Sequence, residues 1–480
     1  MAHRTLDPED WSDVRAQGHR MLDDIFDHIE SLREQPLWRA PPQALRDGFR
    51  AELPRAPSDL GEVHQQFRDT ILPYSSGNAH PGFMGWVQGG GNVAGMLAEM
   101  LAAGMNSNLG GRDHMPLEVE QQVLAWTREM FGFPPGASGL FVTGASQANF
   151  LAVLIARRRA LGPDVRTQGL GAAGARMTAY ASSSVHGCLG RAMDMAGLGA
   201  EALRLVAVDA GHRIDLDALR AAIAADRDAG LTPFLLVGTA GSVDVGAIDD
   251  LAALAGIAAD EGLHFHVDGA FGALGVLAPS IAPRLAGLER ACSIAFDWHK
   301  WGQTPYDAGF LLVRDAELHR SAFAADAHYL RRAERGLAGG DWWPCDYGPD
   351  LSRGFRALKT WFTIKTYGAT ALGAVIEGTC ALAQDLARRV RAEPELELLA
   401  PVGLNVVCFR FADADPDPLN IEIVMRLHEA GVVAPSLTRI DGQAAIRAAI
   451  VNHRTEARDI AALVEATLET GRKCRQRRAA

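Results

Sequence analysis

The 480-residue sequence has few cysteines and no long uninterrupted apolar segment. None of its six cysteines lies in a Cys-x-x-Cys pair, which argues against zinc ribbons and dithiol redox motifs, and we expect no metal site. No apolar run approaches the length that spans a bilayer. The charged first ten residues also lack the apolar core of a secretory signal. These absences predict a protein without membrane association, for which a reducing cytoplasm is the simplest location.

The sequence also has fewer positively charged residues than negatively charged ones. The chain has 47 Lys and Arg against 58 Asp and Glu, a net charge of −11, which argues against a nucleic-acid-binding face. The one basic run, at 472–478, is short and typical of a solvated terminus. With 48% hydrophobic and 22% charged residues, the composition is that of an ordinary globular protein, and we expect a small molecule as its partner.

Short apolar segments alternate with alanine-rich helical stretches between about residues 136 and 314. This alternation predicts an α/β fold with a mostly parallel sheet and helices on both faces. The segments of strand length are 140–143, 177–181, 203–208, 234–238, 264–267, 293–296 and 309–313. The seventh follows the sixth without a helical crossover, which permits it to run antiparallel.

The flanking sequence divides the chain into three parts. Residues 1–75 carry two amphipathic helices, at about 8–35 and 60–72, separated by a proline-rich linker. Two helices bury little apolar surface by themselves, so we expect this segment to pack on another surface. Residues 76–365 would form the large domain, which ends in a helix running from 355 past 372. Residues 366–480, with strands at 406–411 and 445–451, would form a small α+β domain.

Several polar residues come directly after predicted strands, where ligands gather in sheets of this kind. Thr143-Gly144-Ala145-Ser146 joins a strand to a helix through small residues, an arrangement that lets backbone amides surround a phosphate. His186 follows the next strand, and a neutral histidine there can lie flat on an aromatic ring. Ser242 ends the segment 239–242 after a third strand. Taken singly, each is better explained by a helix cap or a turn.

Asp268 and Lys300 give these positions a chemical meaning. Lys300 lies between His299 and Trp301 after a buried-looking strand, and a buried lysine readily becomes a neutral nucleophile. Asp268 ends the strand before it, and a carboxylate at that place can keep a pyridine nitrogen protonated. The order of phosphate loop, histidine, aspartate and lysine therefore points to pyridoxal 5'-phosphate (PLP).

These segments resemble the group II PLP-dependent amino-acid decarboxylases of fold type I, the aromatic-L-amino-acid decarboxylase family. The resemblance runs from about residue 14 to 451, and its most specific parts are 78–83, 143–149, His186, 266–270, 299–301 and 351–359. It implies a seven-stranded sheet, PLP as cofactor, and a homodimer with shared active sites.

The resemblance also implies a role for each matching residue. Lys300 would bond to the cofactor aldehyde, Asp268 would pair with the ring nitrogen, and His186 would stack on the ring. Arg353 and Arg356 would make structural or carboxylate contacts. The other implied cofactor contacts are Thr143, Ala145, Ser146, Ser242, Ala270 and His299, and the implied substrate contacts are His80, Phe83 and Trp86.

The implied reaction is decarboxylation of an L-amino acid, aromatic or similar in size, to the amine and carbon dioxide. The chain departs from the family at Asp297-Trp298 and around 82–86, and its Tyr347 and Tyr329 do not align cleanly with the loop tyrosine thought to return a proton. Tyr347 is the candidate donor. Loss of that tyrosine in relatives accompanies oxygen-dependent aldehyde formation, so an aldehyde synthase is one alternative. An aminotransferase and a non-catalytic relative of the same fold are the others.

Overall fold

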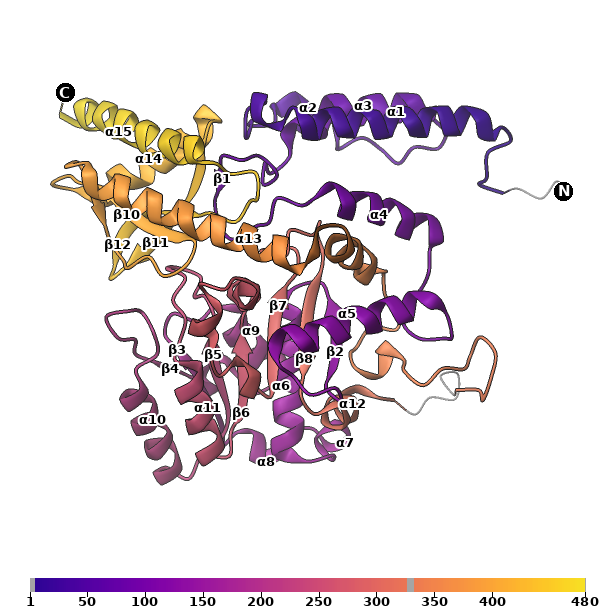
Figure 1. Cartoon of the computed structure of the whole chain (residues 1–480), viewed down its shortest axis with the longest axis vertical. Helices are drawn as coiled ribbons and strands as arrows, with labels where there is room; N and C mark the ends of the chain where they lie inside the picture. Colours follow the sequence, from indigo (N-terminus) through magenta and orange to yellow (C-terminus); the bar gives the residue numbers. More distant parts are fainter. Residues whose placement is uncertain (1–4, 326–331, 480) are drawn as a thin grey trace.

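The computed structural model describes residues 5–325 and 332–479, and a seven-stranded sheet forms its centre (Figure 1). The strand order is β2-β8-β7-β6-β5-β3-β4. All neighbours run parallel except β8, which is antiparallel to both β2 and β7. The predicted sheet, including its antiparallel strand, is confirmed. The strands are β2 (Ser138–Val142), β3 (Met177–Ser182), β4 (Leu203–Val206), β5 (Thr232–Thr239), β6 (His264–Asp268), β7 (Ser293–Asp297) and β8 (Gly309–Val313).

Helices cover both faces of this sheet because its strands are apolar on both sides. Leu235 faces one layer and its neighbour Leu236 the other, as the period of two requires. One layer contains α6 (Ala145–Leu161), α9 (Cys188–Met195) and α12 (Ala316–Phe323). The other contains α5 (Met115–Phe131), α10 (Leu216–Asp228) and α11 (Leu251–Asp260). Asp215 and Asp250 begin α10 and α11 as side-chain caps.

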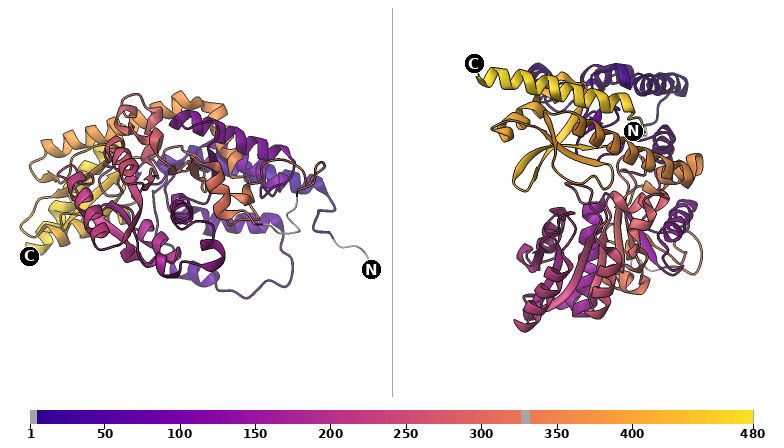
Figure 2. Two further views of the ribbon diagram at one scale, coloured as in Figure 1. Left: turned by 90° about the horizontal axis from the view of Figure 1, so that it is seen from below. Right: turned by 60° about the vertical axis from the view of Figure 1, so that its left-hand side comes forward.

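The C-terminal part forms a second sheet, in the order β1-β11-β12-β10-β9. Its strands are β1 (Phe83–Met84), β9 (Leu396–Leu398), β10 (Val406–Phe411), β11 (Ala434–Ile440) and β12 (Gln443–Ala449), and α14 (Pro416–Ala430) and α15 (Ala457–Ala479) pack on it. Figure 2 shows this domain stacked on the large one. Strand β1 comes from the N-terminal side of the large domain yet pairs with β11. The chain therefore crosses between the two sheets before the large sheet begins.

Helix α13 (Arg356–Ala392) runs from the large domain into the small one, where its second half contacts β9, β10 and α15. Gly368, at φ 79° and ψ 153°, interrupts the helix with a backbone conformation that glycine tolerates. The interruption lies close to the boundary predicted at residue 365. The domain limits themselves stay a prediction.

The N-terminal helices α1 (Trp11–Glu30), α2 (Gln43–Gly48) and α3 (Leu60–Thr70) form a separate layer that lies beside the small domain in Figure 1. The layer docks through Arg33, which pairs with Asp459 at 2.7 Å. Helix α2 lies in the segment predicted as a linker. The remaining helices are α4 (Val93–Met105), α7 (Val165–Gln168) and α8 (Gly171–Gly174), with 3₁₀ turns at Leu32–Glu34, Leu72–Tyr74, Ala200–Ala202, Gly272–Leu277, Ala282–Leu285, Leu288–Arg290 and Pro344–Asp346. No helix among the described residues is long and apolar enough to cross a membrane.

Candidate active site

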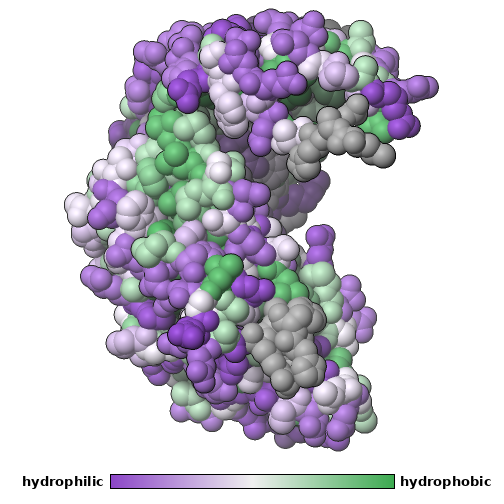
Figure 3. Space-filling model, turned by 90° about the vertical axis from the view of Figure 1, so that its right-hand side faces the viewer, coloured by the Kyte–Doolittle hydropathy of each residue, from purple (hydrophilic) through white to green (hydrophobic). Residues whose placement is uncertain are grey.

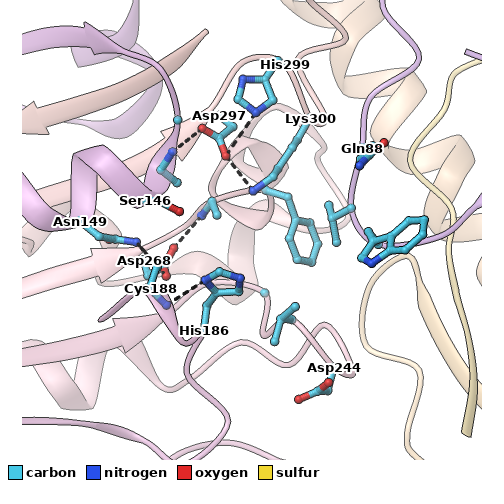
Figure 4. Close-up of a pocket in the computed structure, with 18 of the residues that line it drawn as sticks. Gln88, Ser146, Asn149, His186, Cys188, Asp244, Asp268, Asp297, His299 and Lys300 are labelled. Atoms are coloured by element: carbon cyan, nitrogen blue, oxygen red, sulfur yellow. Dashed lines mark hydrogen bonds and ion pairs between the residues drawn. The ribbon is translucent and has the colours of Figure 1, made fainter. Parts of the chain in front are cut away.

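A cavity of about 470 Å³ lies where the parallel strands of the large sheet end, and the small domain forms its opposite wall (Figure 4). The segments that follow β2, β3, β5, β6 and β7 all reach it. Nine of the residues predicted from the sequence line this cavity: Trp86, Thr143, Ala145, Ser146, His186, Asp268, Ala270, His299 and Lys300. Residues more than 200 positions apart in the sequence are thus brought to one place by the sheet.

Lys300 projects into the cavity from the turn after β7 (Figure 4). Its Nζ lies 2.7 Å from Oδ2 of Asp297, the last residue of that strand. The other oxygen of Asp297 accepts a hydrogen bond from the backbone N–H of Ala145 at 2.7 Å. Sequence reasoning noted Asp297 only as a departure from the family. In the structure it joins the lysine to the start of α6.

His299 is buried beside this pair. Burial lowers the pKa of its imidazole to about 4, so the ring is neutral near pH 7. Its Nδ1 accepts from the N–H of Ala308 at 3.0 Å, which leaves the proton on Nε2, 3.6 Å from Asp297. The ring of Tyr306 packs against it with the two centroids 4.3 Å apart.

The start of α6 offers a place for an anion. The N–H of Ala145, its first residue, donates to the Asp297 carboxylate, so this end of the helix already holds an anionic group, and Ser146, with its hydroxyl, is the next residue at the cavity. Gly309 of β8 allows this turn to approach, since a Cβ on it would lie 2.3 Å from the Cα of Gly144. Thr143 also lines the cavity, although its hydroxyl is bonded to Gln147 at 2.9 Å.

Asp268 ends β6, and its carboxylate is buried at the floor of the cavity. One oxygen accepts from Asn149 Nδ2 and the other from the N–H of Ala270, both at 3.1 Å. Burial raises the pKa of this carboxyl, an effect that the positive charge of Lys300 opposes. No positively charged group among the described residues is bonded to the Asp268 carboxylate. It can therefore pair with a positively charged group of a ligand. Asn149 lies in the segment 143–149 that carries the family resemblance, but sequence reasoning gave it no role.

His186 lies beside Asp268, and its Nδ1 accepts from the N–H of Cys188 at 3.2 Å (Figure 4). The Cys188 thiol also lines the cavity. Burial raises the pKa of that thiol to about 12, so it stays protonated and is a poor nucleophile. Lys300 is therefore the residue at this cavity best suited to form a covalent bond.

Three residues predicted for the cofactor or substrate do not line the cavity. Ser242 lies next to it, with its hydroxyl accepting from the N–H of Ala247 at 3.0 Å. His80 is buried, and its Nδ1 accepts from the N–H of Gly82 at 3.0 Å. Phe83 belongs to β1 and packs on Trp86 with ring centroids 6.0 Å apart.

The predicted proton donor and the two arginines also lie elsewhere. The ring of Tyr347 packs against His319, with the centroids 5.1 Å apart, and Tyr329 lies outside the described residues. Arg353 is buried against Glu120 at 2.6 Å. Arg356 pairs with Asp307 at 2.8 Å, beside a second cavity.

Sequence reasoning missed one buried cation at the cavity, Arg447 of β12. Its guanidinium donates to the carbonyl of Trp86 at 2.9 Å and to that of Asp244 at 3.1 Å. Its Nη2 has no hydrogen-bond partner within 5–325 and 332–479. The available signal was a lone basic residue in an otherwise apolar predicted strand.

The comparisons with known proteins agree with this geometry. A family profile described as the pyridoxal-dependent decarboxylase conserved domain matches residues 42–412. The chain belongs to this family. It is 29% identical to an aromatic-L-amino-acid decarboxylase of Bacillus atrophaeus, with 92% of each chain covered. It is also 29% identical to a phenylacetaldehyde synthase of Arabidopsis thaliana, with 95% of each covered. A solved structure of Oryza sativa TDC with PLP and tryptamine superposes with a TM-score of 0.90 at 26% identity, covering 98% of this chain and 99% of that one.

The predicted family, fold class and PLP-dependent carboxy-lyase activity are thereby confirmed, and PLP is the cofactor. The residues present suit this cofactor. Lys300 offers an amine for its aldehyde, the start of α6 offers donors for its phosphate, and Asp268 offers an unpaired buried carboxylate for its ring nitrogen. Among the residues that the structure describes, no cluster of three or more His, Cys, Asp or Glu is arranged to hold a metal.

Proposed function

We propose that this decarboxylase acts on an L-amino acid with an aromatic or similarly sized side chain. The observation that carries the proposal is that Lys300, which follows β7, and Asp268, which ends the adjacent β6, share one cavity with an apolar wall. That wall contains Trp86, Val87, Val243, Phe271 and Leu437. Apolar surface of this kind favours a large apolar side chain over a small polar one. The curated names of the relatives support the same substrate class.

PLP, when bound, supplies an aldehyde that bonds to the substrate amine and a protonated ring that takes up the electron pair left at Cα when carbon dioxide departs. The chain then has four tasks. Lys300 provides the amine that holds the cofactor before substrate arrives. Asp268 keeps the proton on the ring nitrogen. His186, which lies beside Asp268, supports the ring, and the α6 start with Ser146 binds the phosphate.

Holding the substrate carboxylate out of the ring plane aligns the bond that breaks, and orientation effects of this kind contribute about 7–11 kcal/mol at best. A proton must then return to Cα to complete the amine. Among the described tyrosines, Tyr306 lines the cavity. Burial raises the pKa of its hydroxyl, so the group keeps a proton to donate near pH 7. We therefore assign the proton return to Tyr306, with Tyr347 as the alternative expected from the sequence.

A second candidate, decarboxylation coupled to aldehyde formation, is favoured by the position of Tyr347 away from the cavity and by the aldehyde synthases among the relatives. A panel of the twenty amino acids, dihydroxyphenylalanine, diaminobutyrate and cysteine sulfinate would separate the candidates. Carbon dioxide with amine from aromatic substrates is the expected result. Aldehyde with hydrogen peroxide would select the second candidate, and keto acid without carbon dioxide would select an aminotransferase.

We further propose a cytoplasmic homodimer whose two chains complete each active site. Apolar side chains lie exposed on α1, α3 and α4, among them Trp11, Val63, Met100 and Met105. Figure 3 shows apolar residues gathered on the side of the molecule to which α4 belongs. Burying such surface in a symmetric interface would remove it from water. Light scattering of the purified protein tests the dimer, and a monomer at micromolar concentration would contradict it.

A further inference from the structure

Four buried polar side chains lie behind Asp268, outside the cavity or at its edge. They are Asn149 on α6, His266 and His264 on β6, and Ser293 on β7, and none is more than 1% exposed. His264 and His266 are two positions apart on one strand, so both face the α6 layer, and His266 is paired in register with Ser293. We call these four residues the histidine chain.

The members of the histidine chain are hydrogen-bonded in series. Asn149 Nδ2 donates to Asp268 at 3.1 Å and also lies 3.3 Å from the Cys188 sulfur. Asn149 Oδ1 is 2.7 Å from His266 Nε2. His266 Nδ1 is 2.8 Å from Ser293 Oγ, and the same oxygen is 3.0 Å from His264 Nε2. The series crosses from the cavity floor into the interior of the sheet.

The direction of every bond in the series follows from its first member. The Asn149 amide must turn its NH₂ to the Asp268 carboxylate, because the reverse would place two acceptors together. Its oxygen then needs a donor, so His266 carries its proton on Nε2. Burial lowers the pKa of both histidines to about 3, so each ring is neutral and has one bare nitrogen.

The bare Nδ1 of His266 accepts from the Ser293 hydroxyl, and that hydroxyl accepts from Nε2–H of His264. The last atom in the series is then the bare Nδ1 of His264, and this atom has no hydrogen-bond partner among the described residues. The unpaired end is therefore an acceptor. This agrees with a series in which every donor points toward Asp268.

Donors aligned in one direction polarise one another and place partial positive charge beside the carboxylate at the end. In a buried site this partial positive charge offsets part of the free-energy cost of burying the ionised Asp268 carboxylate. We propose that the histidine chain is a positioning device that keeps Asp268 ionised and oriented toward the cavity, and so strengthens its pairing with the cationic ring nitrogen of PLP. The proposal rests on the role assigned to Asp268 above.

A matched pair of variants tests this proposal. Ser293→Ala removes the link between the two histidines without touching the cavity. Ser138→Ala is the control, because Ser138 is also a buried strand residue and its hydroxyl lies 2.8 Å from Nδ1 of the buried His319. Ser293→Ala loses two hydroxyl–imidazole bonds and Ser138→Ala loses one, all in the same sheet, but only Ser293 leads to Asp268.

The readouts are the equilibrium affinity of the apoenzyme for PLP, the ¹⁵N NMR shift of bound PLP labelled at its ring nitrogen, and the melting temperature. We expect both variants to melt at lower temperatures, with the larger loss in Ser293→Ala because its hydroxyl makes two bonds to imidazoles. Ser293→Ala should also bind PLP about tenfold more weakly, the effect of weakening one bond to a charged group, and its ¹⁵N signal should move toward that of neutral pyridine. Ser138→Ala should leave affinity and signal unchanged.

Asp268→Asn separates the two possible failures. An unchanged ¹⁵N signal in that variant would overturn the proposed role of Asp268. A changed signal there, with Ser293→Ala indistinguishable from Ser138→Ala, would overturn the positioning role of the histidine chain alone. If Ser293→Ala does not fold, Ser293→Cys replaces it. A thiol is a weaker donor, so we expect a smaller shift of the same sign, and its absence would count against the proposal.

Discussion

The buried ion pair of Arg353 and Glu120 allows the most direct prediction of stability. The two side chains are 1% and 2% exposed and make two hydrogen bonds to each other, at 2.6 and 3.1 Å. Arg353 also donates to the carbonyls of Leu109 at 2.8 Å and Phe141 at 3.0 Å. The guanidinium thereby joins α5, the loop before it and β2.

Glu120→Gln would leave the Arg353 guanidinium buried without an anion. In addition, an N–H group of the new glutamine amide would point at the N–H donors of Arg353. Breaking a buried pair in this way costs about 3–5 kcal/mol. The entropy of unfolding is about 2.1 cal/mol/K per residue, or roughly 1 kcal/mol/K for this chain, so we expect Tm to fall by about 3–5 °C. The double variant Glu120→Leu/Arg353→Met should recover most of that loss, because it leaves no unpaired charge.

Calorimetry of the unmodified protein, the variants Glu120→Gln and Arg353→Met, and the double variant provides the assay, together with kcat and KM of the folded variants. Since Arg353 does not line the cavity, KM should be unchanged in Arg353→Met. A loss of Tm below 1 °C in Glu120→Gln would refute the reasoning. So would a raised KM with normal Tm in Arg353→Met, because that result would assign Arg353 to the substrate carboxylate.

Three further outcomes follow from the site and the core. Tyr306→Phe should shift product from amine toward aldehyde while Tyr347→Phe does not, as chromatography of the products would show; the reverse result would restore Tyr347 as donor. Gly309→Ala should weaken PLP binding about tenfold or more, because the new methyl would displace Gly144 at the phosphate turn, and unchanged affinity would contradict this. The pKa of His319 falls from 6.5 in the unfolded chain to about 3 on burial, so its stabilising effect is complete above pH 6.5 and declines as pH falls toward 3. His319→Phe should therefore take up about one proton fewer on unfolding near pH 5, and an unchanged pH dependence would refute the assignment.

The large sheet was predictable because its strands are buried on both faces. Segments such as 234–238 and 309–313 are continuously apolar, and helical stretches separate most of the predicted strands, so few topologies remain. Helix α2 was missed because prolines surround it, and β1 was missed because a two-residue strand carries no periodic pattern. Short elements of this kind form through their partners, here β11, rather than through their own sequence.

The residues of the site also divide into those that their own sequence pattern predicts and those that depend on contacts with distant elements. Lys300, Asp268, His186 and Ser146 were predictable because each follows its own strand, and a parallel sheet brings strand ends to one edge. Arg447 reaches the cavity from the small domain instead, and its approach depends on how β12 packs above the large sheet. No local pattern specifies such a contact.

Asp297 shows why identity at a position says less than geometry. As a sequence feature it is a substitution beside the lysine, with no evident consequence. In the structure its two oxygens contact the Lys300 amine and the Ala145 amide, the two groups proposed to engage the aldehyde and the phosphate of PLP. The residue that departs from the family thus links the two ends of the cofactor site, and a contact with both ends is a property of the fold rather than of the motif.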